Sequence, residues 1–396
     1  MPQNTDEMMK HITAFLRDSP LPRAAIGHLW VFRTEVARWE GEPSPEHTVF
    51  VKTQQGRFLG SAVYSPNSNI ALRIFSRQKL CLEQDLLRKK FESAIASRSF
   101  TGKETLRLIW SEADGVPGLT VDVYSGKAVV FQITHAAIEE KRDWVLQTIE
   151  ELLQPEILVE RSEGPGRKKE GLPERIQQHK GTIPIIQTKI GNALFEINLL
   201  TDQKTGAYLD QAHNYRRVAA VCAGKSVLDC FCYKGGFAIH CALAGAKKVV
   251  AVDSSKEALE SLNKSALLNN VTVETCLANV FDNLRHRQKS REIWDVLILD
   301  PPPFARSHSN VTNALRGYRE INLRALKLLP PGGILATYTC SYHIQPHEFL
   351  QVLREAANDA RKEAVVLEEH YQSPDHPILL AMPESKYLHG WLLQVL

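Results

Sequence analysis

Residues 224–253, GKSVLDCFCYKGGFAIHCALAGAKKVVAVD, decide the fold because they alternate short apolar runs with a glycine turn. The first run, residues 226–229, leads into adjacent glycines at 235 and 236, so the chain leaves a buried strand through a turn that small residues permit. Residues 237–244 carry a helical apolar pattern, and residues 247–252 form a second apolar run. We therefore predict a strand, a turn, a helix and a second strand, which make half of a nucleotide-binding fold.

An aspartate ends each predicted strand. Asp229 ends the first, and Asp253 follows the second, where a carboxylate can accept hydrogen bonds from both hydroxyls of a ribose. The dinucleotide fingerprint G-x-G-x-x-G, which seats a pyrophosphate at a helix N-terminus, is absent from this stretch. We therefore expect a nucleoside ligand without phosphates. Taken alone, the stretch also fits an ordinary β-α-β unit whose glycines only tighten a turn.

The composition is that of a globular protein with two or three domains. The chain has 396 residues, of which 43% are hydrophobic and 23% are charged, which excludes a disordered or fibrous protein. The formal net charge is only +3, so no field of the whole protein attracts nucleic acid. Any surface that binds RNA must therefore be local.

The cysteines and the N-terminus predict a cytoplasmic protein with reduced thiols. The seven cysteines are odd in number and unevenly spaced, and the first residues contain no apolar core of signal-peptide length. No apolar run approaches the roughly 18 to 20 residues that a membrane span needs, so we expect no membrane partner. Cys230, Cys232, His240 and Cys241 resemble metal ligands, but a second CxxC pair is missing, and we expect no metal site.

Short alternating segments predict a small β domain in the first part of the chain. Residues 1–20 are expected to form one short amphipathic helix or a loose arm, and residues 27–75 alternate apolar and polar side chains between turns. The spacing of Trp30, Tyr64 and Arg73 resembles the PUA domain at the front of one bacterial methyltransferase family. PUA domains are RNA-binding barrels, so the resemblance implies contact with RNA.

A second domain is predicted after this β region. It begins with an amphipathic helix over residues 84–98, continues with strands within residues 105–133, and includes a helix over residues 137–153. The Gly-, Lys- and Arg-rich residues 163–175 are predicted to form a mobile loop. Their basic cluster is more often just solvated, but it is the best local candidate for RNA contact.

Two further strands end in residues that can carry chemistry. Residues 294–300 form an apolar run that ends in Asp300, and the three prolines that follow fix an extended wall, because proline continues neither a ladder nor a helix. Residues 334–338 form the next strand, which delivers Cys340 within Thr-Cys-Ser. Ligands bind at the carboxyl edge of doubly wound sheets, so a substrate base is expected between Asp300 and Cys340.

Several motifs together resemble the bacterial ribosomal RNA large subunit methyltransferase I family, and the match runs from about residue 23 to the C-terminus. The resemblance implies an α/β fold in which a class I S-adenosylmethionine (SAM) methyltransferase domain, Rossmann-like, follows a small β-barrel PUA domain and a small α+β middle domain. The motifs are Glu112-Ala-Asp-Gly-Val-Pro-Gly-Leu119, Gln203-Lys-Thr-Gly206, Tyr208-Leu-Asp-Gln211, Asp300-Pro-Pro-Pro-Phe304 and Thr339-Cys340-Ser341.

The cysteine separates two kinds of methylation. Carbon 5 of cytosine is not nucleophilic until a thiolate adds to carbon 6, whereas methylation of an exocyclic amine needs no thiol. The resemblance implies that Cys340 is the nucleophile and that Asp300 binds the cytosine and stabilises the charge of the adduct. The cofactor is then SAM and the substrate is large-subunit (23S) ribosomal RNA. Tyr318 and Asn322 share a helix face and are candidates to line the base pocket, or only to pack and cap.

The resemblance also assigns the cofactor site and implies a homodimer. The residues expected to bind SAM are Tyr208, Asp210, Asp229, Tyr233, Gly235, Asp253 and Asn279. The family usually has arginines where this chain has Ala212 and Tyr215, and SAM folds usually have an acid where it has Asn279. Pro303 stands, as in the family, where many RNA enzymes of this class carry a second cysteine, so the proton of carbon 5 needs another base.

The sequence thus predicts a PUA-like domain over residues 1–78, a middle domain over 79–190 and a methyltransferase domain over 191–396. Two alternatives stay open. One is a SAM-dependent enzyme that methylates a guanine or an exocyclic amine of RNA through the Asp-Pro-Pro-Pro-Phe motif alone. The other is a non-catalytic RNA-binding factor of ribosome assembly, which the residues at positions 212, 215 and 279 favour.

Overall fold

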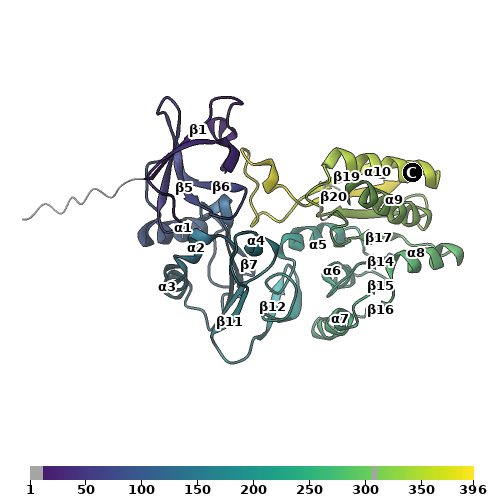
Figure 1. Cartoon of the computed structure of the whole chain (residues 1–396). Coiled ribbons are helices and arrows are strands. Elements are labelled where there is room, and N and C mark those ends of the chain that lie inside the picture. Colours follow the sequence, from purple (N-terminus) through teal and green to yellow (C-terminus); the bar gives the residue numbers. More distant parts are fainter. Residues whose placement is uncertain (1–11, 306–309) are drawn as a thin grey trace, which may run out of the picture. The chain divides into compact units, whose positions relative to one another are not determined.

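The structure, a computed structural model, describes residues 12–305 and 310–396 (Figure 1). The chain divides into two compact units. The first unit reaches Ile186 and also contains Asn198–Ala207 and Pro377–Pro383. The second contains Gln187–Ile197, Tyr208–His376 and Glu384–Leu396. The domain boundaries expected after residues 78 and 190 stay a prediction.

The first unit begins with a six-stranded sheet in the order β2-β6-β5-β4-β1-β3. The prediction of a helix or loose arm is wrong for β1, which pairs with β3 and, in parallel, with β4. All five β1 side chains are buried, because the strand has a neighbour on each edge and lies over the core. Residues 1–11 of that prediction lie outside the described residues. The strands are β1 (Ile12–Leu16), β2 (Trp30–Phe32), β3 (Val36–Glu40), β4 (Thr48–Thr53), β5 (Phe58–Tyr64) and β6 (Ile70–Ser76).

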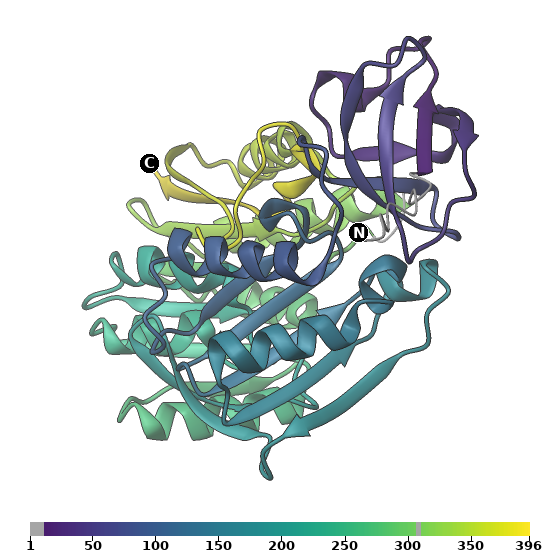
Figure 2. The ribbon, with the colours of Figure 1, turned by 90° about the vertical axis from the view of Figure 1, so that its left-hand side faces the viewer.

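A five-stranded sheet in the order β11-β10-β9-β8-β7 follows in the same unit. Helices α1 (Gln84–Ser97) and α3 (Arg142–Leu153) lie side by side over one face of it (Figure 2). The single helix predicted over residues 137–153 is two, because Lys141 leaves the helical conformation between α2 (Ala136–Glu139) and α3. The strands are β7 (Leu106–Trp110), β8 (Leu119–Tyr124), β9 (Ala128–Ile133), β10 (Ile157–Ser162) and β11 (Arg175–Lys180).

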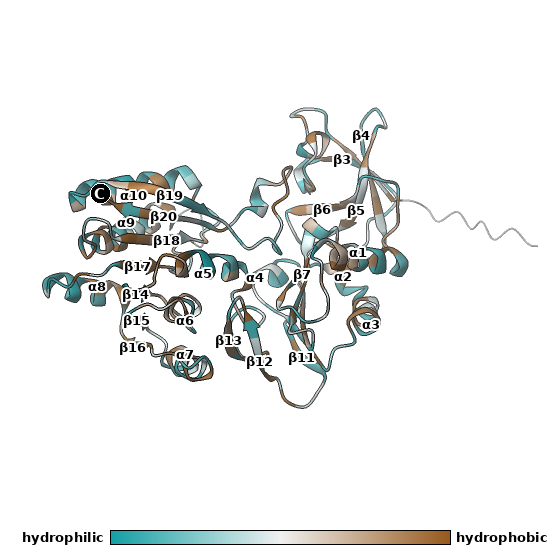
Figure 3. Ribbon diagram, turned by 180° about the vertical axis from the view of Figure 1, so that it is seen from behind, coloured by the Kyte–Doolittle hydropathy of each residue, from teal (hydrophilic) through white to brown (hydrophobic). Residues whose placement is uncertain are grey.

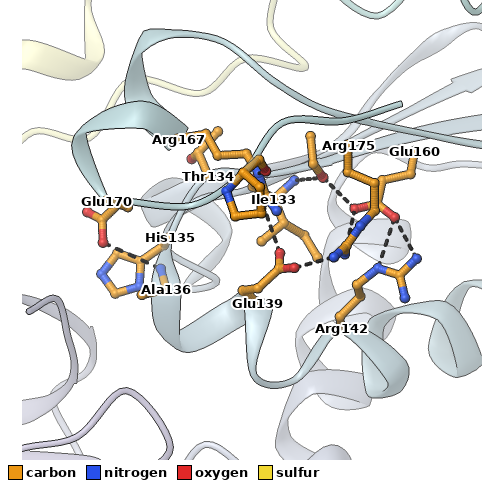
Figure 4. Close-up of polar contacts among 12 residues, drawn as sticks. Ile133, Thr134, His135, Ala136, Glu139, Arg142, Glu160, Arg167, Glu170 and Arg175 are labelled. Carbon is orange, nitrogen blue, oxygen red and sulfur yellow. Dashed lines mark hydrogen bonds and ion pairs between the residues drawn. The ribbon is translucent and has the colours of Figure 1, made fainter. Parts of the chain in front are cut away.

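The mobile loop predicted over residues 163–175 is wrong. The segment contains helix α4 (Pro165–Lys169), which begins on a proline, and ends where β11 begins. Arg167 is fully buried and donates to the Ile133 carbonyl oxygen and to Glu139 Oε2, both at 2.8 Å (Figure 4). Arg175 donates to the other oxygen of Glu139, also at 2.8 Å. Part of the predicted RNA patch is therefore committed to ion pairs inside the unit.

Two motifs that the sequence placed in different domains meet within the first unit. Trp30 donates its indole N–H to Glu112 Oε1 at 2.8 Å, and Arg73 Nη1 donates to the same oxygen at 2.9 Å. Burial alone would raise the pKa of Glu112, but Arg73, Ser111 and Trp30 together lower it. This partly buried ion pair joins the six-stranded sheet to the five-stranded one.

The second unit is built on a seven-stranded sheet in the order β16-β15-β14-β17-β18-β20-β19. The first five strands of this order are parallel, and β20 is antiparallel to both β18 and β19. The central strands are apolar along their length (Figure 3), because helices cover both faces of the sheet. The strands are β14 (Ser226–Cys230), β15 (Lys248–Asp253), β16 (Glu274–Leu277), β17 (Val296–Leu299), β18 (Ile334–Thr339), β19 (Ala364–His370) and β20 (His389–Val395).

The strand-turn-helix-strand unit predicted from residues 224–253 is confirmed as β14, α6 and β15. Helices α8, α9 and α10 pack on one face of the sheet, and α6 packs on the other. The helices are α5 (Ala212–Ala219), α6 (Gly236–Leu243), α7 (Lys256–Leu268), α8 (Val280–Lys289), α9 (Val311–Lys327) and α10 (Pro346–Ala360). A separate two-stranded sheet consists of β12 (Ile185–Ile190) and β13 (Ala193–Asn198). Within residues 12–305 and 310–396, no helix has the length and apolar character to cross a membrane.

Candidate active site

The chemistry-bearing residues of the second unit follow the carboxyl ends of four parallel strands. Asp229 lies near the end of β14, Asp253 ends β15, Asp300 follows β17 and Cys340 follows β18. These strands are neighbours in the order β15-β14-β17-β18, so their ends share one edge of the sheet. Ligands bind at this edge in open α/β sheets, because the loops that leave it diverge around a crevice.

The turn after β14 has a strained backbone. Phe231 and Tyr233 adopt φ of +62° and +47°, a left-handed conformation that costs a residue with a side chain roughly 1–2 kcal/mol. Gly235 has φ +79°, and a Cβ there would lie 2.6 Å from Leu262. A Cβ on Gly236 would collide with the Tyr215 ring. The two glycines are therefore required by packing within the unit, and the strain at Phe231 and Tyr233 marks the turn as a candidate ligand loop.

The two acids beside this turn have different environments. Asp253 accepts the backbone N–H of Tyr233 at 2.8 Å and that of Ser255 at 2.9 Å, so it holds the turn against β15. Asp229 is fully buried; its Oδ2 accepts the N–H of Ala238 at 3.0 Å, and its Oδ1 has no partner among the described residues. Burial, and then the charge of Asp300, raises the pKa of Asp229 well above its usual range.

The segment before α5 brings further polar groups to the same edge. The Tyr208 ring meets the Tyr233 ring edge to face at 5.4 Å, and buried Asp210 accepts the Tyr387 hydroxyl at 2.8 Å. Burial raises the pKa of Tyr208, and the charges of Asp300, Tyr233, Asp210 and Cys340 raise it further. Tyr208 therefore lies within electrostatic reach of residues from both the glycine turn and the strand ends.

Gln211 connects this segment to Asp300. Its side-chain amide donates to Asp300 Oδ1 at 3.1 Å, and its own oxygen accepts from Asn214 at 2.7 Å. Asn214 also donates to the Tyr371 carbonyl oxygen at 2.9 Å, which fixes the orientation of both amides. The sequence analysis quoted Gln211 within a motif but assigned it no role. The available signal was its place at the end of a dense polar run immediately before the glycine-turn unit.

Cys340 lies between two hydroxyl residues at the end of β18. It is partly buried, and its Sγ lies 4.0 Å from the Pro301 carbonyl oxygen of the proline wall. Cys230 and Cys232 differ from it, because both are buried and burial raises the pKa of each thiol. All seven cysteines lie in the described ranges and none forms a disulfide. The Cys340 thiol is therefore partly accessible from the carboxyl edge of the sheet, whereas the Cys230 and Cys232 thiols are enclosed in the core.

Two family models match the chain. A model of S-adenosylmethionine-dependent methyltransferases matches residues 181–381, and a PUA-like domain model matches residues 17–77. The chain is 37% identical to ribosomal RNA large subunit methyltransferase I of Aeromonas hydrophila over 93% of its own length and 95% of the relative. It is also 37% identical to the protein of that name from Photobacterium profundum, with the same coverage. The chain belongs to the ribosomal RNA large subunit methyltransferase I family.

A solved structure supports the same fold. A protein from Streptococcus mutans, described as a SAM-dependent methyltransferase, superposes with a TM-score of 0.82 at 18% identity. The comparison covers 97% of this chain and 100% of that one. The family architecture expected from the sequence is therefore confirmed, with a PUA-like domain in front, an α/β middle part and a Rossmann-like methyltransferase domain.

SAM is the cofactor of this methyltransferase family, and the residues at the sheet edge fit it. The unpartnered Oδ1 of buried Asp229 is a polar atom that a bound ligand can satisfy, and Asp253 ends the strand where a ribose is expected. The rings of Tyr208 and Tyr233 lie beside the turn. SAM supplies an electrophilic methyl group on a sulfonium when it is bound.

The structure brings most of the predicted site residues together, although their binding roles stay predictions. Tyr208, Asp210, Asp229, Tyr233, Gly235, Asp253, Asp300 and Cys340 all lie near the carboxyl ends of neighbouring strands. Asn279 caps helix α8, and its oxygen accepts the N–H groups of Phe281 and Asp282 at 3.0 and 3.4 Å. This oxygen is therefore already engaged by the backbone, and adenine recognition through it stays a prediction.

Of the two departures from the family pattern, Tyr215 has a structural explanation. Ala212 is the first residue of α5, and Tyr215 is buried against Gly236, where it packs on Phe237 with ring centroids 4.7 Å apart. Its hydroxyl donates to the Tyr208 carbonyl oxygen at 3.3 Å. Tyr215 therefore stabilises the glycine turn and the Tyr208 backbone by packing and one hydrogen bond, where the family usually has a charged arginine.

Tyr318 and Asn322 do not line an open pocket. Both are fully buried, and the Asn322 amide donates to the Tyr318 carbonyl oxygen at 2.8 Å. The packing alternative is the correct one. Among the described residues, no group of three or more His, Cys, Asp and Glu side chains is arranged to hold a metal ion. His240, one of the residues that resembled ligands, lies instead near the carbonyl oxygens of Gly236 and Ile190, at 2.7 and 3.0 Å.

Proposed function

We propose that this protein transfers a methyl group from SAM to carbon 5 of a cytosine in large-subunit ribosomal RNA. The relatives carry that RNA in their names. The observation that carries the proposal is the position of Cys340. It follows β18, the strand next to β17 and its Asp300, and its sulfur lies 4.0 Å from the Pro301 carbonyl oxygen. A thiol in that place serves methylation of a ring carbon, and methylation of an amine has no use for it.

The reaction begins at Cys340. Its thiolate adds to carbon 6 of the cytosine, which makes carbon 5 nucleophilic. Carbon 5 then attacks the methyl group that bound SAM would supply, and the electron pair of the broken carbon–sulfur bond would stay on the cofactor sulfur. A base removes the proton of carbon 5, and elimination of the Cys340 thiolate restores the aromatic ring. The thiolate is thereby regenerated, and the enzyme is ready for a second turnover once the base has released the proton of carbon 5.

In this proposal, Asp300 binds the cytosine ring of the substrate. Gln211 holds Asp300 Oδ1, which fixes the carboxyl plane beside the proline wall. The carboxyl group contacts a ring nitrogen or the amino group of cytosine and stabilises the charge that develops as the adduct forms. The base must leave its stack to reach both Asp300 and Cys340, so the target is a flipped or single-stranded nucleotide.

The PUA-like domain is the proposed RNA-binding part, because PUA domains are RNA-binding barrels. The six-stranded sheet carries Arg38 over the Phe15 ring, 3.5 Å from its centroid, and Arg38 is exposed. An exposed cation on an aromatic ring can meet phosphate on its outer side. The homodimer and the cytoplasmic location stay predictions from the sequence.

The decisive experiment identifies the methylated nucleoside. We incubate the protein with SAM and ribosomal RNA that lacks modifications, digest the RNA, and analyse the nucleosides by mass spectrometry. New 5-methylcytosine is expected, and Cys340→Ala is expected to abolish it. Cys276→Ala is the matched control, because this thiol is also partly buried at a strand of the same sheet. Methylated guanine or adenine, or turnover by Cys340→Ala, would refute the adduct. A protein that binds SAM and RNA and forms no product would support a non-catalytic role.

A further inference from the structure

Tyr318 stands between the two catalytic motifs. It lies in α9, its side chain is fully buried, and its ring packs against Phe304 with centroids 4.6 Å apart. Phe304 is the last residue of the Asp300-Pro-Pro-Pro-Phe304 motif. On another side the ring meets Phe349 of α10 edge to face at 5.1 Å. The ring is therefore fixed by aromatic contacts and has no freedom to enter a substrate pocket.

The Tyr318 hydroxyl bonds to both neighbours of Cys340. The Thr339 hydroxyl donates to Tyr318 Oη at 3.0 Å, and Tyr318 Oη lies 2.9 Å from Ser341 Oγ. In the bond between Tyr318 and Ser341 either hydroxyl can donate, because each has one proton and can also accept. The Ser341 backbone N–H returns to Thr339 Oγ1 at 3.2 Å, which closes a ring of hydrogen bonds around the backbone of Cys340.

The same ring of bonds touches the proline wall. Ser341 Oγ also accepts the backbone N–H of Ala305 at 3.5 Å, directly after Phe304. Thr339 and Ser341 are both buried, so a hydroxyl that loses its partner here gains none from water. Burial raises the pKa of Tyr318 to about 12, so its hydroxyl stays protonated at neutral pH and acts as a hydrogen-bonding group. One phenol thus fixes the two residues that flank Cys340 relative to the turn that carries Asp300.

We propose that Tyr318 is a positioning residue, which holds Cys340 in place for attack through Thr339 and Ser341. This inference rests on the proposed function, because it requires Cys340 to be the nucleophile. A displacement of about 1 Å in a reacting atom costs roughly a hundred-fold in rate. Loss of the Oη atom loosens both flanking residues while the ring contacts persist.

The test uses the full chain and RNA in which 5-fluorocytidine replaces cytidine. Fluorine at carbon 5 cannot leave as a proton, so an adduct that has been methylated stays covalent and is measured on a denaturing gel. We expect Tyr318→Phe to form this complex roughly ten- to a hundred-fold more slowly than the unchanged protein at saturating RNA and SAM. Its affinity for SAM, measured by calorimetry, is expected to stay within about two-fold, since its contacts lie at β18 and the proline wall.

Tyr338→Phe is the matched control. Tyr338 is equally buried, precedes Thr339 on β18, and loses one hydroxyl partner, His370 at 2.8 Å, when the phenol is removed. Successive side chains of a strand point to opposite faces, so this variant leaves the Thr339 side chain undisturbed. We expect its trapping rate to match that of the unchanged protein.

The outcomes separate the two proposals. Rapid trapping by Tyr318→Phe, with none by Cys340→Ala, overturns the role of Tyr318 and leaves the proposed function in place. Trapping by Cys340→Ala overturns the proposed function itself. Slow trapping by Tyr318→Phe and Tyr338→Phe alike would reduce Tyr318 to a general packing role and overturn the inference. A fall in the trapping rate with unchanged SAM affinity, in protein that is still folded at the assay temperature, supports it.

Discussion

In the first unit a buried or partly buried carboxylate meets an arginine, whereas buried Asp229 of the second unit meets a backbone N–H. Glu139 bonds to Arg167 and Arg175, and Asp122 accepts two bonds from Arg107 at 2.8 and 2.7 Å (Figure 4 shows the Glu139 group). At the sheet edge of the second unit, burial and the nearby charge of Asp300 raise the pKa of Asp229. The charged form of these carboxylates is therefore stabilised by arginine in the first unit, whereas the charged form of Asp229 is destabilised in the second.

This difference separates structural charge from functional charge. A buried carboxylate that already has its cation gains nothing from a ligand, and its loss damages the fold. A buried carboxylate with an unpartnered oxygen costs stability, and a bound ligand can recover that cost. The comparison predicts that substitutions in the first unit affect folding and that substitutions at the sheet edge affect binding and catalysis.

The largest effect on stability is expected at the Arg107–Asp122 pair. Asp122 is fully buried, so Arg107→Met leaves its charge without a cation, although the Thr205 hydroxyl still donates to it. Breaking a buried pair on one side costs about 3–5 kcal/mol. Thermal unfolding followed by calorimetry should show a large loss in melting temperature, while SAM affinity stays unchanged.

The double variant Arg107→Met/Asp122→Leu is the control for this substitution. It removes both charges, so it should recover much of the lost stability. A single variant that melts with the unchanged protein would mean that the pair contributes little. The claim that buried ion pairs of the first unit stabilise the fold would then be wrong for a pair whose carboxylate is fully buried.

The sequence predicted those parts of the molecule that local patterns specify. The strand ends at Asp229, Asp253 and Asp300 follow from apolar runs that stop at a polar residue, and the cysteine after β18 follows in the same way. Residues 12–16 were predicted wrongly because their pattern is mostly apolar and short, and only the place of the segment between β3 and β4 makes it a strand. Local patterns therefore locate the carboxyl edge of the sheet in the second unit, but they do not show where the six-stranded sheet of the first unit begins.

The partners of side chains that lie far apart in the chain could not be predicted from the sequence. Arg167 lies in a run of basic and glycine residues that is typical of a solvated loop, yet its partner Glu139 comes from 28 residues earlier in the chain. Tyr318 likewise lies 21 and 23 residues from Thr339 and Ser341. Such partners are selected by how helices pack on sheets, and one sequence carries no signal of that.

The second prediction concerns Asp229. Its pKa is higher in the folded protein than in the unfolded chain, so the folded state binds its proton more tightly. Stability that is present at low pH is therefore lost as the pH rises above the usual range of an aspartate near 4. Asp229→Asn removes this penalty and keeps a side chain of the same shape. We expect it to raise the free energy of unfolding at pH 7 by about 1–3 kcal/mol and to weaken SAM binding.

A pH series provides the control for Asp229→Asn. The gain in stability over the unchanged protein should grow from pH 4 to pH 7, because only the unchanged protein carries the titrating group. An equal gain at every pH would assign the effect to packing. Tighter SAM binding by the variant would remove Asp229 from the cofactor site.

The smallest effect is expected at Glu112, with the opposite sign. Burial raises its pKa, but Arg73, Ser111 and Trp30 outweigh burial and lower it, so the folded protein binds this proton less tightly than the unfolded chain does. The stability from Glu112 is therefore complete above the usual range of a glutamate and is lost as the pH falls through the folded pKa.

Glu112→Gln keeps an oxygen for Trp30 and Arg73 and removes only the charge. We expect a loss of about 1 kcal/mol at pH 7 that shrinks only as the pH falls below about 4. The free energies of unfolding of Glu112→Gln and Asp229→Asn should differ from that of the unchanged protein in opposite directions at pH 7. Both should converge with it in acid. A shared sign would mean that burial alone governs both carboxylates and that the arginine of the first unit is irrelevant to its partner.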